Sequence, residues 1–141
     1  MKRILIMGLS GTGKTTFAEQ LRKELSALNK TVLWYNADNI RERYNDWDFS
    51  YEGRIRQAKR MKQLADISIS DYVICDFVAP FQEMRDIFDA DYIVWMNTEK
   101  NSDYKDTDSI FEPPANANYI LTAKAAEQMV PYVLKDILQQ K

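Results

Sequence analysis

Hydrophobic residues along this chain are grouped in five short, nearly continuous runs that are rich in β-branched and aromatic side chains. Runs of this kind are typical of strands that are buried on both faces of a parallel sheet. They are ILIMGL (4–9), TVLWY (31–35), YVICDF (72–77), YIVWM (92–96) and YILT (119–122).

Between these runs, apolar residues recur three and four positions apart, which is the spacing of a helix that packs one face on a sheet. The first stripe comprises Phe17, Ala18, Leu21, Leu25 and Leu28. The second belongs to a helix with Ser50 as its N-cap and comprises Ile55, Ala58, Met61, Leu64 and Ala65. A short helix should follow Pro80. The last should cover about 123–139, kinked or delayed by Pro131, with an inward face of Val130, Val133, Leu134, Ile137 and Leu138.

Strands that alternate with helices predict an α/β fold, a doubly wound parallel sheet with right-handed crossovers and helices on both faces. The 141 residues fit a single domain over 1–141, large enough to bury a core without disulfides. The longest stretch without periodicity, 98–118, contains two adjacent prolines and clustered Asn, Asp and Ser. We expect it to be a functional loop, because compact domains seldom carry long idle ones.

Composition narrows the classes of function. Acidic and basic residues number 21 and 19, for a net charge of -2, which argues against a nucleic-acid surface. The chain has no histidine, so a zinc site or a Ser-His-Asp triad is excluded. Its one cysteine, Cys75, lies in an apolar run and is expected to be buried. No run is long enough for a membrane span or has the flanks of a signal peptide, so we expect a cytoplasmic protein.

The most specific motif is GLSGTGKTT (8–16), which matches G-x-x-x-x-G-K-[ST] between the first strand and the first helix. Glycines let backbone N–H groups surround phosphate oxygens, and the helix N-terminus adds a positive dipole end. Lys14 would neutralise the β- and γ-phosphates, and the Thr15 hydroxyl would bind Mg²⁺. The fold is therefore predicted to be a P-loop NTPase three-layer sandwich with a five-stranded sheet. The predicted ATP-binding residues are Gly8, Ser10, Gly11, Thr12, Gly13, Lys14, Thr15 and Thr16.

A P-loop does not say where the γ-phosphate goes. A GTPase would need N-K-x-D after a later strand, which NTEK (97–100) resembles only superficially, and motor ATPases are generally longer. A small kinase fits the length. Its acceptor should bind at the carboxyl ends of the strands, which directs attention to 36–57 and 76–80.

Polar residues in the first of these segments suit an acceptor. Asp38 and Arg41 are three apart, so they share one side of a starting helical turn. Asp38 could orient or deprotonate a hydroxyl, and Arg41 could bind an anion; the alternative is an N-cap Asp followed by an exposed Arg. Arg54 and Gln57 share a helix face just beyond Phe49. The three residues could offer a nucleotide a positive charge, amide hydrogen bonds and a stacking ring; the alternative for Phe49 is a place in the core.

Together these blocks resemble the adenylylsulfate kinase family. The blocks are GLSGTGKTT, ADNIR, FS with Arg54 four residues on, and FVAP followed by Arg85. Enzymes of this family transfer the γ-phosphate of ATP to the 3′-hydroxyl of adenosine 5′-phosphosulfate. The resemblance covers most of 3–122 and implies a small-molecule nucleotide substrate, ATP and Mg²⁺ as cofactors, and a homodimer.

Carried over by position, the resemblance implies that Asp38 is the carboxylate nearest the acceptor hydroxyl. It also implies that Arg41 and Arg54 bind the phosphosulfate and ribose region of the acceptor nucleotide. Gln57 would read the adenine, and the ring of Phe49 would stack on it. DYKDTDSIFEPP (103–114) resembles a further family block, which makes Tyr104 the second aromatic of the clamp. Phe77 and Val78 complete the acceptor site. Catalysis would rest on Lys14 and Asp38, and Thr15, Asp38 and Asp76 are the candidate metal residues; the alternative for Asp76 is a structural hydrogen-bonding role.

Three departures from the family pattern keep two other functions open. The family sequence Asp-Gly-Asp-Asn is replaced by Asn36-Ala37-Asp38-Asn39, so one of two carboxylates is lost. The family's Ser before a Pro is replaced by Ala79, which has no hydroxyl. The family's basic lid after the fourth strand is replaced by NTEKNSDY (97–104). One alternative is a P-loop kinase with another hydroxyl acceptor: a nucleotide, a modified base or a nucleic-acid end. The other is a nucleotide-binding module without catalysis.

Overall fold

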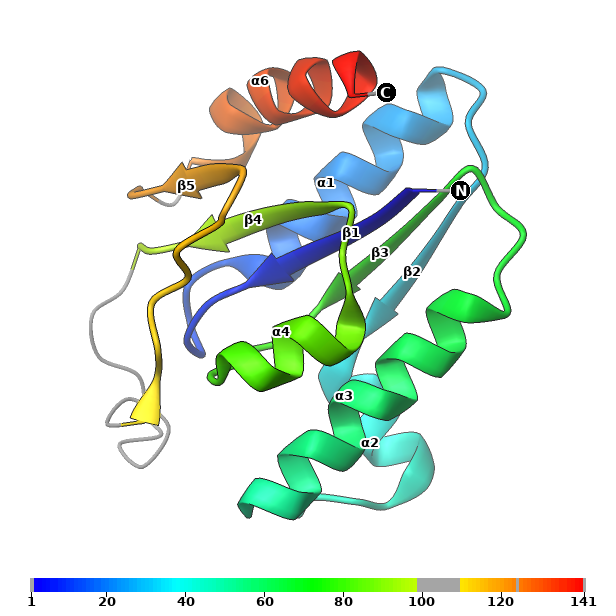
Figure 1. Ribbon diagram of the computed structural model, residues 1–141. Helices are drawn as coiled ribbons and strands as arrows, with labels where there is room; N and C mark the ends of the chain where they lie inside the picture. The colour runs from blue at the N-terminus through cyan, green and yellow to red at the C-terminus, as the bar shows by residue number, and fades with distance from the viewer. Residues whose placement is uncertain (1, 99–109, 124, 141) are drawn as a thin grey trace.

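A five-stranded, fully parallel sheet forms the centre of the molecule (Figure 1). The computed structural model describes residues 2–98, 110–123 and 125–140. The strands are β1 (Lys2–Met7), β2 (Val32–Asn36), β3 (Tyr72–Asp76), β4 (Tyr92–Met96) and β5 (Tyr119–Leu121), in the order β2-β3-β1-β4-β5. All five strands predicted from the hydrophobic runs are present, and the predicted sheet is confirmed.

Helices cover both faces of this sheet, as Figure 1 shows. Helices α1 (Lys14–Ala27) and α6 (Ala126–Gln139) pack on one face. Helices α3 (Tyr51–Asp66) and α4 (Gln82–Phe88) pack on the other, where α2 (Ala37–Tyr44) also lies. Side chains along β1 alternate between the two cores, with Ile4 and Ile6 facing α1 and Leu5 and Met7 facing α3. Cys75 is fully buried, as predicted, and burial raises the pKa of its thiol.

The register of the strands places the carboxyl ends of β1, β2 and β3 side by side at one edge of the sheet. Ile6 pairs with Asp76, and Asn36 pairs with the same Asp76 from the other side. The segments that follow β1, β2 and β3 therefore leave the sheet at one edge, where open α/β sheets bind their ligands.

Several details differ from the prediction. Leu28 and Leu138 were expected inward but are 47% and 42% exposed, because Leu28 lies at the C-cap of α1 and Leu138 in the last turn of α6. Helix α6 begins at Ala126, later than expected, and continues through Pro131. The helical turn expected at Asp38 and Arg41 is the start of a helix over residues 37–44. Ser50 caps α3 as predicted, its hydroxyl accepting the Gly53 N–H.

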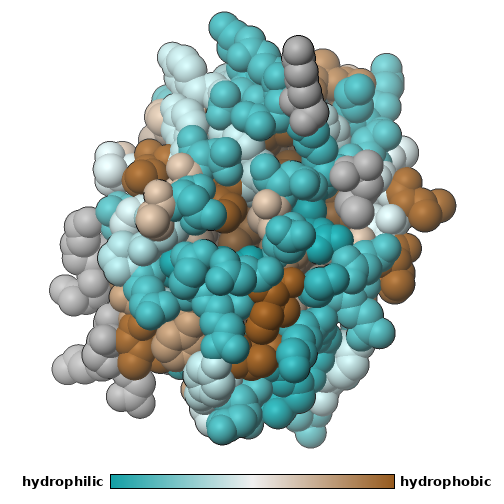
Figure 2. Space-filling model, viewed as in Figure 1, coloured by the Kyte–Doolittle hydropathy of each residue, from teal (hydrophilic) through white to brown (hydrophobic). Residues whose placement is uncertain are grey.

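The face of the molecule shown in Figure 2 is mainly hydrophilic, with hydrophobic side chains in separate patches. Within the described residues, no helix is both long and apolar enough to cross a membrane.

Candidate active site

The loop between β1 and α1 has the backbone that its glycines permit. Gly11 and Gly13 have φ angles of 83° and 95°, in the left-handed region that favours glycine. A Cβ on Gly8 would lie 2.6 Å from the Met96 carbonyl oxygen, so β4 passes too close for any other residue. Thr12 is buried, and its hydroxyl donates to the Leu9 carbonyl at 2.9 Å. Since Gly13 provides no side-chain cap, the first N–H groups of α1 remain available to an anion.

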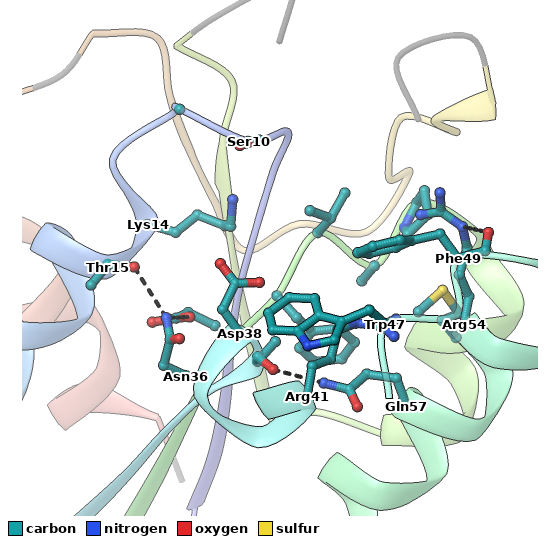
Figure 3. Close-up of a pocket in the computed structure, with 18 of the residues that line it drawn as sticks. Ser10, Lys14, Thr15, Asn36, Asp38, Arg41, Trp47, Phe49, Arg54 and Gln57 are labelled. Atoms are coloured by element: carbon teal, nitrogen blue, oxygen red, sulfur yellow. Dashed lines mark hydrogen bonds between the residues drawn. The ribbon is translucent and has the colours of Figure 1, made fainter. Parts of the chain in front are cut away.

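Lys14 opens α1 and points back over this loop. Its Nζ donates to the Leu9 carbonyl at 2.8 Å. Burial lowers the pKa of the amine from 10.5 to about 8, and the negative charges of Asp76 and Asp38 limit the shift. Figure 3 shows the Lys14 side chain close to Asp38, with its amine turned toward the loop near Ser10.

The depressed pKa of Lys14 predicts that nucleotide binding takes up protons. At pH 8 about half of the free protein carries a neutral Lys14 amine, and bound phosphates would restore the charged form. We expect uptake of about half a proton per ATP at pH 8, rising toward one at pH 9, while affinity falls. Calorimetry in two buffers of different ionisation enthalpy measures this, and binding without uptake in this range would contradict it.

Asp76, at the end of β3, is held by hydrogen bonds to both carboxylate oxygens. Oδ2 accepts from the Trp34 indole at 2.8 Å, and Oδ1 accepts from the Asn36 amide at 2.7 Å. The side chain is 2% exposed, and burial raises its pKa to about 6 despite these donors. The structural hydrogen-bonding role weighed for Asp76 is therefore present, and a role in binding metal stays a prediction.

Helix α2 places Asp38 and Arg41 differently from the alternative reading of an N-cap Asp and an exposed Arg. The N-cap is Asn36, whose side-chain oxygen accepts the Asn39 N–H at 3.1 Å. Asp38 is exposed in the first turn, and Arg41 is only 5% exposed. The alternative is thus wrong for both residues.

Phe49 lies between two guanidinium groups. The Arg41 guanidinium carbon is 4.4 Å from the ring centroid, and that of Arg54 is 5.4 Å away. Cations at such distances are attracted by the ring quadrupole. Arg54 Nε also donates to the Phe49 carbonyl at 2.8 Å. The ring is 46% exposed, so Phe49 is not a core residue.

Gln57 is the most enclosed of the predicted acceptor residues, at 1% exposure. Its amide nitrogen donates to the Ala37 carbonyl at 3.0 Å, and its oxygen accepts from Arg60 at 2.8 Å. Gln57 therefore fastens α3 to the start of α2. The adenine-reading role implied by the resemblance stays a prediction.

A network of salt bridges and hydrogen bonds stabilises the connection between α2 and α3. Asp46 pairs with Arg56 at 2.7 Å and with Arg60 at 2.9 Å, and these partners hold the pKa of the Asp46 carboxyl well below its usual range. Arg41 donates to the carbonyls of Asp46 and Asp48 at 3.0 and 3.1 Å. The segment 46–49 is thereby held beside the pocket.

The first turn of α3 packs so closely on this connection that only glycine fits at residue 53. A Cβ there would lie 2.2 Å from the Asp48 carbonyl oxygen. We expect Gly53→Ala to push the connection away and to lower the free energy of unfolding by about 2 kcal/mol or more. Thermal or urea unfolding measures the loss, with Gln63→Ala on the exposed side of α3 as the matched control. Equal stability of the two variants would contradict the close contact.

A cavity of about 560 Å³ lies at the carboxyl edge of the sheet. Figure 3 shows its two ends, with Lys14 and Thr15 at one and Phe49 and Arg54 at the other. Most of the predicted site residues line it, namely Ser10, Gly11, Gly13, Lys14, Thr15, Thr16, Asp38, Arg41, Phe49, Arg54, Gln57, Asp76, Phe77 and Val78. Gly8 and Thr12 belong to the same loop but contact Met96 and the Leu9 carbonyl instead of lining the cavity. Tyr104 lies outside the described residues.

One polar and one aromatic lining residue, Asn36 and Trp47, were missed by the sequence analysis as candidates for the site. Asn36 was treated as a lost carboxylate, yet its amide reaches both Asp76 and the Thr15 hydroxyl, the latter at 3.1 Å. Trp47 is 48% exposed, and its ring centroid is 6.5 Å from that of Phe49. A signal was available for Trp47, since an aromatic residue in a polar connection is a common feature of binding sites.

The donor atoms at the phosphate end suit Mg²⁺. Thr15, Asp38 and Asp76 offer only oxygen, the ligand that this hard cation prefers. In the part of the chain that the structure describes, no group of three or more His, Cys, Asp and Glu could hold a metal. The set therefore fits a Mg²⁺ ion that takes most of its ligands from phosphates and water.

The glycine loop before α1, the sheet order and the cavity at the carboxyl edge define a P-loop protein of the α/β class. The family profile of adenylylsulphate kinase matches residues 2–99. The chain belongs to the adenylylsulfate kinase family.

The sequence is also similar to individual adenylyl-sulfate kinases. An adenylyl-sulfate kinase of Bacillus licheniformis is 36% identical over 85 residues, which are 58% of this chain and 43% of that protein. Adenylyl-sulfate kinase 3 of Arabidopsis thaliana is 33% identical over 86 residues, 59% of this chain and 41% of that one. The matched part of the chain thus spans less than half the length of these curated relatives.

Solved structures share the fold over nearly the whole chain. The APS kinase of Mycobacterium tuberculosis in complex with AMPPNP and APS has a TM-score of 0.82 at 19% identity, covering 98% of both chains. Shikimate kinase of Acinetobacter baumannii in complex with shikimate has a TM-score of 0.65 at 18% identity, covering 100% of this chain and 95% of that one. At these identities the likeness concerns the fold.

Proposed function

We propose that this protein transfers the γ-phosphate of ATP to the 3′-hydroxyl of adenosine 5′-phosphosulfate. The observation that carries the proposal is the cavity itself, which joins the P-loop to Asp38 and to the Arg41, Phe49 and Arg54 group. Membership of the adenylylsulfate kinase family and the names of the relatives support the same reaction.

At the phosphate end, this chain supplies positive charge and N–H groups. The α1 N-terminus and Lys14 would bind the β- and γ-phosphates, and Thr15 with Asp38 or Asp76 would hold Mg²⁺ and its water ligands. When bound, Mg²⁺ would neutralise the charge that develops on the transferring group. Asp38 lies close to Lys14 in the cavity (Figure 3), where its carboxylate would orient a hydroxyl for attack on the γ-phosphate.

At the acceptor end, the guanidinium groups of Arg41 and Arg54 lie against the ring of Phe49. Arg41 and Arg54 would bind the phosphosulfate and ribose region, since guanidinium groups present several N–H donors to anionic oxygens. The exposed half of the Phe49 ring would stack on the adenine. Phe77 and Val78 also line the cavity.

The direct test is a product assay with ATP, Mg²⁺ and adenosine 5′-phosphosulfate. We expect a 3′-phosphorylated product from the wild-type protein and none above background from Lys14→Ala. If the two proteins give the same result, the proposed reaction is wrong.

A second candidate, a P-loop kinase of another acceptor, is favoured by the contacts of Gln57. Its amide is already bonded to Ala37 and Arg60, and the exposed Trp47 ring adds a stacking surface that the family block did not predict. The same assay with a panel of nucleosides, nucleotides and oligonucleotide ends decides between the two. ATP binding without turnover of any acceptor would instead support a module without catalysis.

Two further predictions belong with this function. We propose a cytoplasmic location, on the lengths and flanks of the apolar runs in the sequence, and a homodimer, as the family resemblance implies. Sedimentation of the purified protein tests the second.

A further inference from the structure

Asn36 and Asp76 face each other at the ends of neighbouring strands, beside the P-loop. They are register partners in the β2–β3 pair. The Asn36 amide nitrogen donates to Asp76 Oδ1 at 2.7 Å and to the Thr15 hydroxyl oxygen at 3.1 Å. The amide thus lies between a buried carboxylate and the hydroxyl at the start of α1 (Figure 3).

The orientation of both side chains is determined by their other partners. The Asn36 oxygen accepts the Asn39 N–H at 3.1 Å as the N-cap of α2, so its nitrogen must face Asp76 and Thr15. The second Asp76 oxygen accepts from the Trp34 indole at 2.8 Å. Only a side chain with two acceptors satisfies both donors at residue 76, and only one with a donor and an acceptor satisfies residue 36.

We propose that Asn36 and Asp76 are a positioning pair for Thr15. Asp76 holds the Asn36 amide, and this amide occupies one lone pair of the Thr15 hydroxyl, which leaves the other lone pair directed to a cation on the bound phosphates. The inference rests on the ATP and Mg²⁺ part of the proposed function and does not depend on the acceptor.

The pair also explains the departure at residue 36. The family pattern has Asp at 36, whereas this chain has Asn there, opposite Asp76. A carboxylate at 36 beside Asp76 would put two acceptors 2.7 Å apart with no donor between them. The amide at 36 is therefore matched to the carboxylate at 76, and Asn36 links that carboxylate to the P-loop.

The coupling is tested with Asn36→Asp, Asp76→Asn and the double variant that exchanges the two. Asn36→Asp removes the donor to Thr15, and Asp76→Asn turns a donor toward either Trp34 or Asn36. In the exchanged protein the new carboxylate at 36 still accepts the Asn39 N–H. The new amide at 76 can accept from Trp34 and donate to residue 36. The Thr15 hydroxyl can donate its hydrogen to the new carboxylate, which again holds the hydroxyl and leaves its lone pairs to the cation, without two carboxylates facing each other.

The readout is calorimetric affinity for a non-hydrolysable ATP analogue, with Mg²⁺ and with a chelator. We expect each single variant to lose at least about tenfold of the gain in affinity that Mg²⁺ gives. Chelator-only affinity should change much less. The exchange should restore the gain to within about threefold of the wild type.

A control with the same chemistry combines Asn29→Asp and Asp89→Asn, which lie in exposed turns after α1 and α4. It should bind like the wild type. A Mg²⁺ gain retained in either single variant, or an exchange no better than the single variants, would overturn the proposal. If the single variants do not fold, a folded exchange with the Mg²⁺ gain supports it and an unfolded one contradicts it.

These outcomes separate the pair from the proposed function. A wild-type protein without any Mg²⁺ gain would overturn both. A restored gain in a protein that does not phosphorylate adenosine 5′-phosphosulfate would reject the acceptor and keep the pair.

Discussion

Replacement of Lys14 by alanine is expected to reduce the rate of phosphoryl transfer at least about a hundredfold, because positioned charge provides most of the catalysis in this reaction. The stability of the fold should not fall. Burial lowers the pKa of Lys14 to about 8, so the folded state disfavours its charged form, and stability rises with pH between about 8 and 10.5 as the unfolded chain binds more protons. Removing the amine at pH 7 therefore removes an unfavourable burial of charge.

The measurement is kcat with ATP and the acceptor, together with the unfolding temperature. Lys23→Ala is the matched control, since Lys23 lies on the same helix, more than half exposed, in an ion pair with Glu19. It should change neither quantity appreciably. A Lys14→Ala protein that turns over at the wild-type rate would remove Lys14 from the mechanism.

Asp38→Asn should also lower kcat at least about a hundredfold, while the fold is preserved. Asp38 is exposed in the first turn of α2, and the N-cap bond of this helix is made by Asn36, so the cap of α2 does not depend on the charge of Asp38. An amide of the same size cannot take a proton from a hydroxyl and binds a metal-bound water more weakly. The affinity for ATP should change little by comparison.

Glu42→Gln supplies the matched control for Asp38→Asn, because it removes one negative charge from the exposed side of the same helix. Its kcat should equal that of the wild type. If both variants lose activity equally, the effect of Asp38 is one of general charge. Near wild-type turnover of Asp38→Asn would show that this carboxylate does not contact the reacting groups.

The sheet and its helices were predictable because their signals are local. A buried parallel strand is an apolar run, and a helix packed on a sheet repeats every three to four residues, so both can be read without knowing what they contact. Leu28 and Leu138 show the limit of this reasoning. They continue an apolar stripe, but each lies where its helix ends and the core no longer covers it.

The site was predictable as far as its residues follow strands. The P-loop, Asp38 and Arg41 lie directly after β1 and β2, so strand position alone places them at the carboxyl edge. The bond between Asn36 and Asp76 was not predictable, since it depends on the pairing of β2 with β3 over a separation of 40 residues. The enclosure of Gln57 depends likewise on how α3 meets α2.

The exposed indole of Trp47 gives the cavity an optical reporter. The chain has three tryptophans. The Trp34 indole donates a hydrogen bond to Asp76, and the Trp95 ring is stacked on that of Phe111 with the ring centroids 6.3 Å apart. Trp47 lines the cavity and has about half of its surface exposed to water. An aromatic ligand placed against that wall would exchange water for a stacked ring and change the emission of this one fluorophore. Occupancy of the acceptor end can thus be followed in the unlabelled protein, separately from turnover.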